Sequence, residues 1–378
     1  MTTNTNARRP AISRRDRHRR AEPAGSEVSR WARQPWLGVA GLSLVIPVAV
    51  LLAVAAGGAE GSLLVFAPLV TFSLPVVAMI AFWWEDWPGT RLGPDWAGWA
   101  DTVLIAVGAV VFTALGSALV GHFSLAAVFD PFPRDAELGT FPATMPLAGA
   151  AFVAMLQLTL VSEHWPVRRF LGPIAGGVAS VVLAWVVALV LWMALLGGKP
   201  FHGEGHGVLT GGQFGAVLTC VGAWQVWLFV LWRGWPFRLV PRQGVRFACA
   251  NVVSLGGGIL TYIVLAVVLG VAPAGVTTMA GDFVAGGLLV GMLFEDAFPA
   301  RWPAGLERAV SLALTLVVAA GLHFALLTVA NSLAWSRSSA IDWVGHVTLN
   351  AVGTSVILHV AIGRRWPFGR RSVGGQET

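Results

Sequence analysis

Histidine and carboxylate side chains are the groups in this chain best suited to chemistry, because together they can ligate zinc, copper, nickel or iron. Three of them alternate with glycines in the segment 202–206, and the glycines would allow these side chains to converge on one ion. Three further histidines are expected near the same side of a membrane. The spacing matches no zinc-hydrolase motif, so a solvated loop that binds nothing is the alternative interpretation. The candidate ligands of a transition metal are His122, His202, Glu204, His206, His323 and His346.

Motifs of the common enzyme classes are absent from the sequence. The chain has no Gly-x-x-x-x-Gly-Lys-Ser/Thr loop for ATP phosphates and no Gly-x-Ser-x-Gly turn for a nucleophilic serine. Its two cysteines, Cys220 and Cys249, do not form a Cys-x-x-Cys pair and are too few for a disulfide-rich secreted scaffold. No catalytic residue is assigned on this basis, and whether the protein is an enzyme stays open.

The composition indicates a membrane protein. Of 378 residues, 56% are apolar and only 12% are charged, and the mean hydropathy is +0.72. Soluble domains average about 25% charged residues, so this chain is poorly suited to a surface that faces water. Ten apolar runs are long enough to be read as membrane-spanning helices. They cover approximately 37–57, 63–83, 101–121, 146–162, 173–197, 213–232, 247–271, 279–294, 308–331 and 345–363.

The ends of alternate runs share a motif that predicts an internal repeat. Four even-numbered runs are followed by Trp-Pro, at Trp87, Trp165, Trp235 and Trp366, and the remaining one by Phe298 and proline. A charged residue lies two positions before each aromatic residue, and an arginine lies two or three positions after each proline. We therefore expect an all-α, polytopic integral membrane protein with ten transmembrane helices. These would form five tandem two-helix hairpin repeats, at roughly 36–94, 95–173, 174–241, 242–304 and 305–369.

An arginine-rich tail sets the expected orientation. Nine of the first 35 residues are arginine, and this segment is expected to be a disordered cytoplasmic tail attracted to anionic lipid. With that end inside, 22 of the 25 basic residues fall on the cytoplasmic side, as the positive-inside rule requires. The expected domains are the tail at 1–35, a transmembrane domain at 36–365 and a short cytoplasmic tail at 366–378. The protein is expected in the plasma membrane with both termini cytoplasmic.

The charged residues that precede the aromatic corners have two interpretations. The repeated Trp, Pro and Arg suit a stop-and-anchor motif, with Trp at the lipid headgroups and Pro at the end of the helix. Alternatively, the acids pair with the bases to form an inner gate that opens during transport. Two polar residues at similar depths in two runs also suggest a shared internal surface. The candidates for transport or gating are Glu85, Glu163, Arg233, Asp296 and Arg364, together with Gln157 and His359.

Three functions are consistent with these patterns. The first is a permease-like transporter of a small solute or lipid-like molecule without its own nucleotide-binding site, an inference from architecture alone. The second is a membrane-embedded metal-binding protein or metalloenzyme that uses the outer-face histidines, where Asp282 and Asp342 are also expected. The third is a structural subunit of a membrane complex, with a membrane-protein partner at the tryptophan-rich inner rim. The lipid bilayer is the expected partner in each case, and no nucleic acid is expected.

The orientation predicts how single cysteines will react in a cysteine-free variant. Cysteines that replace Glu137, Gly203 and Ser338 are expected to react with an impermeant thiol reagent added to intact cells, because the basic residues keep the other set of loops inside. Cysteines that replace Thr90 and Gln243 are expected not to react. Reaction at position 90 from outside would reject this orientation.

Overall fold

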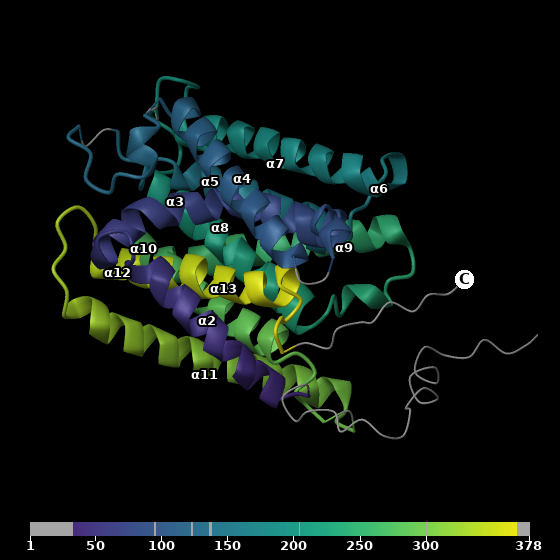
Figure 1. The fold of residues 1–378 in the computed structure, drawn as a ribbon. Helices are drawn as coiled ribbons and strands as arrows, with labels where there is room; N and C mark the ends of the chain where they lie inside the picture. The colour runs from purple at the N-terminus through teal and green to yellow at the C-terminus, as the bar shows by residue number, and fades with distance from the viewer. Residues whose placement is uncertain are drawn as a thin grey trace, which may run out of the picture.

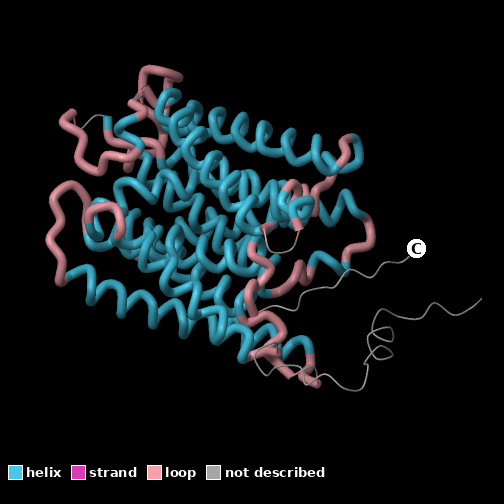
Figure 2. Tube along the Cα trace, viewed as in Figure 1, coloured by secondary structure: helices cyan, strands magenta, loops and turns pink. Residues whose placement is uncertain are grey.

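The computed structural model describes residues 33–93, 96–121, 124–135, 138–203, 205–299 and 301–368. Within these ranges the chain is helical, has no β-strand, and places its loops mainly at the two ends of a helix bundle (Figure 1, Figure 2). Nine of the described helices are long and apolar enough to cross a membrane. The expected all-α class is therefore confirmed, and these helices support the expected multi-pass membrane protein. Most of the two expected tails lies outside the described ranges.

The helices match the expected runs closely, but one is short. Helix α5 (Met145–Leu156) continues to Val161 and totals 17 residues, or about 25 Å, which is less than the roughly 30 Å of the hydrocarbon core. The nine longer helices are α2 (Trp36–Val54), α3 (Gly58–Ala78, continuing to Trp83), α4 (Ala97–Leu119), α7 (Pro173–Leu196), α8 (Gly211–Gln225, continuing to Leu231), α9 (Gln243–Tyr262, continuing to Val268), α10 (Pro273–Leu288, continuing to Leu293), α11 (Ala304–Asn331), and α12 (Ala340–His346) joined to α13 (Gly353–Ile357).

Five helices form an inner ring around the axis of the bundle. In ring order they are α3, α5, α8, α10 and the continuous pair α12–α13, and each packs against the next, with α12 closing the ring against α3. The ring helices are the more enclosed ones: 89% of the apolar stretch of α3 is buried, against 11% in α9 and in α11. The short α5 belongs to this ring, where other helices surround it.

The remaining five helices cover the ring from outside. Helix α4 packs on α3, α7 on α5, α9 on α8, α11 on α10, and α2 on the α12–α13 pair. Figure 1 shows α7 and α11 as the outermost helices on opposite sides of the bundle. Large apolar side chains of this outer layer are exposed, including Val252 at 70% and Val317 at 67%. Exposed apolar surface of this kind suits contact with lipid.

Glycines let the outer helices approach the ring closely. A Cβ on Gly258 of α9 would lie 2.6 Å from the Cα of Val221 on α8. A Cβ on Gly116 of α4 would overlap the Phe72 ring on α3. Small residues at helix contacts are the usual means by which membrane helices pack tightly. The two layers are therefore held together by contacts that a larger side chain would break.

Each ring helix ends in the same backbone turn, which we call a corner. The residues just before it form a wider π-helical segment, as at Met79–Trp83 and Leu358–Ile362. The chain then reverses at a charged residue with a positive φ, a conformation that is uncommon for residues other than glycine. The five residues and their φ angles are Glu85 (52°), Glu163 (49°), Arg233 (51°), Asp296 (59°) and Arg364 (49°).

Gly256 and Gly258 form a matched pair of test positions on α9. Gly258→Ala is expected to destabilise the fold by about 1–3 kcal/mol, because its Cβ would overlap Val221. Gly256→Ala is expected to be neutral or slightly stabilising, since a Cβ there meets no atom within 4 Å and alanine favours the helix. Thermal unfolding in detergent measures both effects. Equal melting temperatures for the two variants would contradict the packing of α9 on α8.

Candidate functional site

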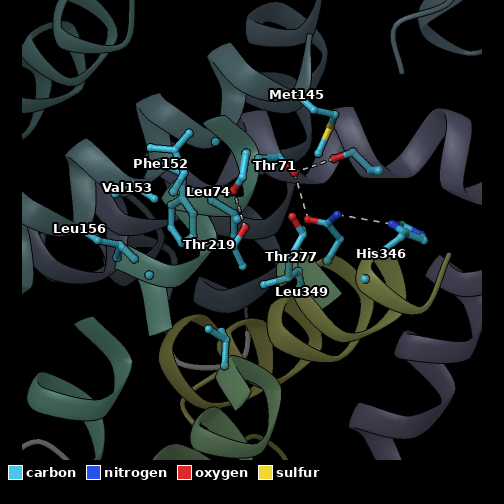
Figure 3. Close-up of a pocket in the computed structure, with 18 of the residues that line it drawn as sticks. Thr71, Leu74, Met145, Phe152, Val153, Leu156, Thr219, Thr277, His346 and Leu349 are labelled. Atoms are coloured by element: carbon cyan, nitrogen blue, oxygen red, sulfur yellow. Dashed lines mark hydrogen bonds between the residues drawn. The ribbon is translucent and has the colours of Figure 1, made fainter. Parts of the chain in front are cut away.

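The inner ring encloses a cavity of about 530 Å³, a size within the range of about 300–1,000 Å³ that is typical of small-molecule sites. All five parts of the ring line it. Figure 3 shows Leu74 from α3, Phe152 from α5, Thr219 from α8, Thr277 from α10, and Leu349 from the segment between α12 and α13 around the same space. A single occupant could therefore contact every ring helix.

The two ends of the cavity differ. At the end away from the corners, the lining includes the exposed residues Pro142 and Gly212, so solvent reaches the lining there. Toward the corners the lining is apolar and half-buried, with Leu160, Met292 and Ile357 among its residues. The cavity thus runs from an accessible end into an apolar interior.

Hydroxyl and amide groups form a polar patch on the lining. The Thr71 hydroxyl has two possible acceptors. They are the Ala67 carbonyl oxygen at 2.7 Å and the Asn350 Oδ1 at 3.0 Å. The Asn350 amide donates to His346 Nδ1 at 3.4 Å, and His346 Nε2 donates to the Leu52 carbonyl at 3.1 Å. An imidazole that accepts at one nitrogen and donates at the other is neutral. Figure 3 shows Thr71 and His346 at the two ends of this uncharged chain.

Three of the four described histidines among the metal candidates have separate partners. His346 uses both ring nitrogens in the polar patch, and His323 contacts Asp282 at 2.7 Å. His202 donates to the Pro200 carbonyl at 2.8 Å, and His206 is exposed. In the part of the chain that the structure describes, no group of three or more His, Cys, Asp or Glu side chains could hold a metal ion. The remaining candidates, His122 and Glu204, lie outside the described ranges, and the metal site stays a prediction from the sequence.

Five ion pairs encircle the bundle at the corners, and we call them the ion-pair belt. Within the described ranges, only Arg233 and Asp296 pair with each other as members of the predicted gate set. The other gate candidates pair with bases or acids on a neighbouring corner or helix. Each pair has at least one exposed side chain, and exposed pairs contribute about 0–1 kcal/mol each. The belt comprises Glu85–Arg168 (3.4 Å), Glu163–Arg246 (3.0 Å), Arg233–Asp296 (2.6 Å), Glu295–Arg365 (3.3 Å) and Asp86–Arg364 (2.6 Å).

Two belt residues have shifted proton affinities. Burial raises the pKa of Asp86, although the hydrogen bond from Arg364 acts in the opposite direction. The hydrogen bond to Asp296 raises the pKa of Arg233. Because a raised carboxyl pKa means protonation at a higher pH, acidification protonates Asp86 more readily than an ordinary aspartate and weakens its contact with Arg364.

Gln157 and His359, predicted to share an internal surface, lie in separate contacts. Gln157 accepts from Gln225 at 2.6 Å and donates to Asn251 at 2.9 Å, so it joins α5, α8 and α9. His359 is buried where Gly41 of α2 approaches the ring. Neither residue is part of the described cavity lining. The amide cluster has the character of an interhelical contact that specifies packing.

The depth of Asp282 differs from the expectation. The sequence places Asp282 at the outer face, in the first turn of the expected run that begins at 279, but α10 begins at Pro273, six residues earlier. Asp282 therefore lies well inside the helix and is only 2% exposed. A proline at the first helical position was the signal that could have placed the helix start correctly. Ionisable groups at membrane depth are functional candidates by default.

Comparison with protein-family models, with curated proteins and with solved structures finds no match to this chain. The functional argument therefore rests on the geometry of the cavity and its surroundings.

Asn350 provides a test of the polar patch. Asn350→Leu keeps the side-chain volume but removes a partner from Thr71 and from His346, which is expected to cost about 1–3 kcal/mol of stability. Thr219→Val is the matched control, because the Thr219 hydroxyl donates to the Gly215 carbonyl of its own helix. Thermal unfolding in detergent is the measurement. Equal losses in both variants would show that the patch is not a connected network.

Proposed function

We propose that this protein binds a small apolar or amphipathic molecule in the central cavity and moves it across the membrane, as a permease-like transporter. The cavity is the observation that carries this proposal. All five parts of the ring line it, so a movement of one ring helix against the others changes its shape. Ligand sites of helical bundles lie between the helices, and those of transporters lie near the middle of the bilayer.

The lining favours a molecule with an apolar body and a hydrogen-bonding group. An ion that leaves water needs charged or coordinating groups to replace its hydration. Besides the neutral His346, Asp342 is the titratable side chain in the described lining, and its carboxylate accepts from Ser339 to cap α12. The threonines and Asn350 remain to orient a polar group. A lipid-like or other weakly polar solute therefore suits this cavity better than an ion.

The proposed architecture has ten spans in five tandem hairpins: α2–α3, α4–α5, α7–α8, α9–α10, and α11 with α12–α13. The short α5 is the tenth span, because it packs between α3 and α8 as a full member of the ring. The five corners with a positive φ at the same point support the repeat. So does the packing of each outer helix on the ring helix that precedes it, with α2 on the last one. Five parallel copies of one hairpin would produce this arrangement.

The proposed orientation places both termini and the ion-pair belt on the cytoplasmic side of the plasma membrane. The positions of 22 of the 25 basic residues support it. The accessible end of the cavity then faces outward. The exposed apolar side chains of the outer helices make the lipid bilayer the proposed partner. Metal binding and a structural role are the alternatives from the sequence, and the cavity favours transport over both.

Cavity-filling variants test the proposal. A Cβ at Gly215 or at Gly256 meets no atom within 4 Å, but Gly215 lines the cavity whereas Gly256 is exposed on α9. Wild-type protein purified in nanodiscs is expected to retain a small molecule that mass spectrometry detects. Gly215→Leu is expected to lose it, because the leucine side chain occupies the cavity, and Gly256→Leu is expected to keep it.

The same variants separate binding from transport. In proteoliposomes, wild-type protein and Gly256→Leu should move the retained molecule across the membrane, and Gly215→Leu should not. If all three proteins retain the same molecules, the cavity is not the binding site. If the molecule is retained but never moved, the protein binds without transporting.

A further inference from the structure

A carboxylate and a histidine contact each other between α10 and α11. The Oδ2 of Asp282 and the Nδ1 of His323 are 2.7 Å apart, and the side chains are 3% and 24% exposed. At 1.5 Å per residue, Asp282 lies about 13 Å from the start of α10 and His323 about 12 Å from the end of α11. Both groups therefore lie in the part of the bundle that hydrocarbon surrounds.

One oxygen of this carboxylate is free to take a proton. Asp282 Oδ1 is buried and has no hydrogen-bond partner among the described residues. The Thr348 hydroxyl also lies within reach of the Asp282 carboxylate, but it donates to the Val344 carbonyl at 3.0 Å. A charged carboxylate with so few polar partners is costly at this depth. Protonation at Oδ1 removes that charge and leaves the contact between Oδ2 and His323 in place.

The other titratable groups on the neighbouring elements are engaged elsewhere. Cys220 and Tyr262 pack with Val276 and Ala280 on α10. His346 belongs to the polar patch, and Asp342 caps α12. Glu307 and Arg308 lie in the first turns of α11, at the opposite end of that helix from His323. His359 lies against Gly41 of α2. His323 is thus the titratable side chain that contacts Asp282.

We propose that Asp282, positioned by His323, is a proton-binding site that is loaded and emptied as the transporter cycles. An O–H bond forms at Oδ1 when a proton arrives from water, and the side chain changes from a charge of −1 to neutral. The reverse step returns the proton to water. His323 keeps its contact with Oδ2 in both states. This inference rests on the proposed function, for which it supplies an energy source: a proton gradient.

The site is mechanically linked to the cavity wall. Thr277 and Thr278 lie on the same helix, about one turn before Asp282, and both line the cavity. A Cβ at the neighbouring Gly281 would lie 2.8 Å from Leu349, another lining residue. This turn of α10 is therefore packed directly against the segment between α12 and α13. A change of charge at Asp282 acts on the contact between two walls of the cavity.

Infrared spectroscopy tests the proton site without the transported molecule, because a protonated carboxyl has its own C=O stretch. As the pH falls, wild-type protein is expected to show an acid band that grows, and Asp282→Asn is expected to remove one component of that band. Asp130→Asn is the control, since this exposed carboxylate accepts from the Phe132 backbone in a loop. It should leave the band unchanged.

His323→Leu separates a positioning role from a merely structural one. It removes the hydrogen bond that favours the charged carboxylate, so the acid band is expected to persist to higher pH. An unchanged titration in His323→Leu would overturn the positioning role. If no pH-dependent band is lost in Asp282→Asn, the pair is a static contact and the proposal is wrong.

Cysteine accessibility tests the link to the cavity. In a cysteine-free variant, the reaction rate of a thiol reagent with Thr277→Cys is compared with that of Ser338→Cys, which corrects for the ionisation of the thiol itself. The ratio is expected to change over the pH range of the infrared titration and to be constant when Asp282→Asn is added. A ratio that changes equally in both backgrounds would overturn the link. The comparison of Gly215→Leu with Gly256→Leu is independent of this result, so failure of the proton site and failure of the cavity are distinguishable.

Discussion

Close contact through glycine between the outer helices and the inner ring is the interaction on which the rest of the structure depends. Lipid tails are as apolar as leucine, so no hydrophobic force drives one spanning helix against another. The helices must instead gain dispersion contacts by approaching closely. Gly258 reaches the backbone of α8, and Gly286 lies 2.8 Å, measured from its Cβ position, from the Thr315 carbonyl of α11. This outer layer compensates for contacts that the ring lacks inside. The side chains around the central cavity lack packing contacts on that side. The ring keeps its shape because the outer faces of its helices pack tightly against the outer layer.

The two ends of the ring are fastened by different chemistry. At the corners, the ion-pair belt connects the ends of the ring helices through pairs with at least one exposed side chain, which water and salt can screen. At the opposite end, the carboxylate of Glu60 on α3 accepts hydrogen bonds from the backbone N–H groups of Ser336, Arg337 and Ser338, which precede α12. Backbone donors converging on one carboxylate form a charge-assisted and more rigid connection. The belt, a set of separate weak contacts, is therefore the end that can rearrange with less loss of free energy.

Much of this arrangement follows from the sequence, and the exceptions have physical causes. Hydropathy located the helices to within a few residues, because burial in hydrocarbon acts on composition. It failed at the start of α10, where the small and polar residues between Pro273 and Asp282 lower the hydropathy of a segment that is nevertheless helical. The corner charges were visible as a motif, but their partners were not, since Glu163 pairs with Arg246 through the packing of α9 beside the second corner. The cavity had no linear signal. Thr219 and Thr277 line it because of the rotation of α8 and α10 about their own axes, which only the packed ring determines.

Helix α10 is where the features of this structure meet. It packs against α8, α11 and α12, lines the cavity with Thr277 and Thr278, and carries Asp282 on the side toward α11. A charge in hydrocarbon is costly wherever it lies, but on an outer helix its cost would bear only on contact with lipid. On α10, the free-energy cost of the charge affects the contacts between ring helices. It therefore affects the shape of the cavity. The proposed proton site therefore depends on the position of Asp282, because the helix that carries this carboxylate is also a wall of the cavity.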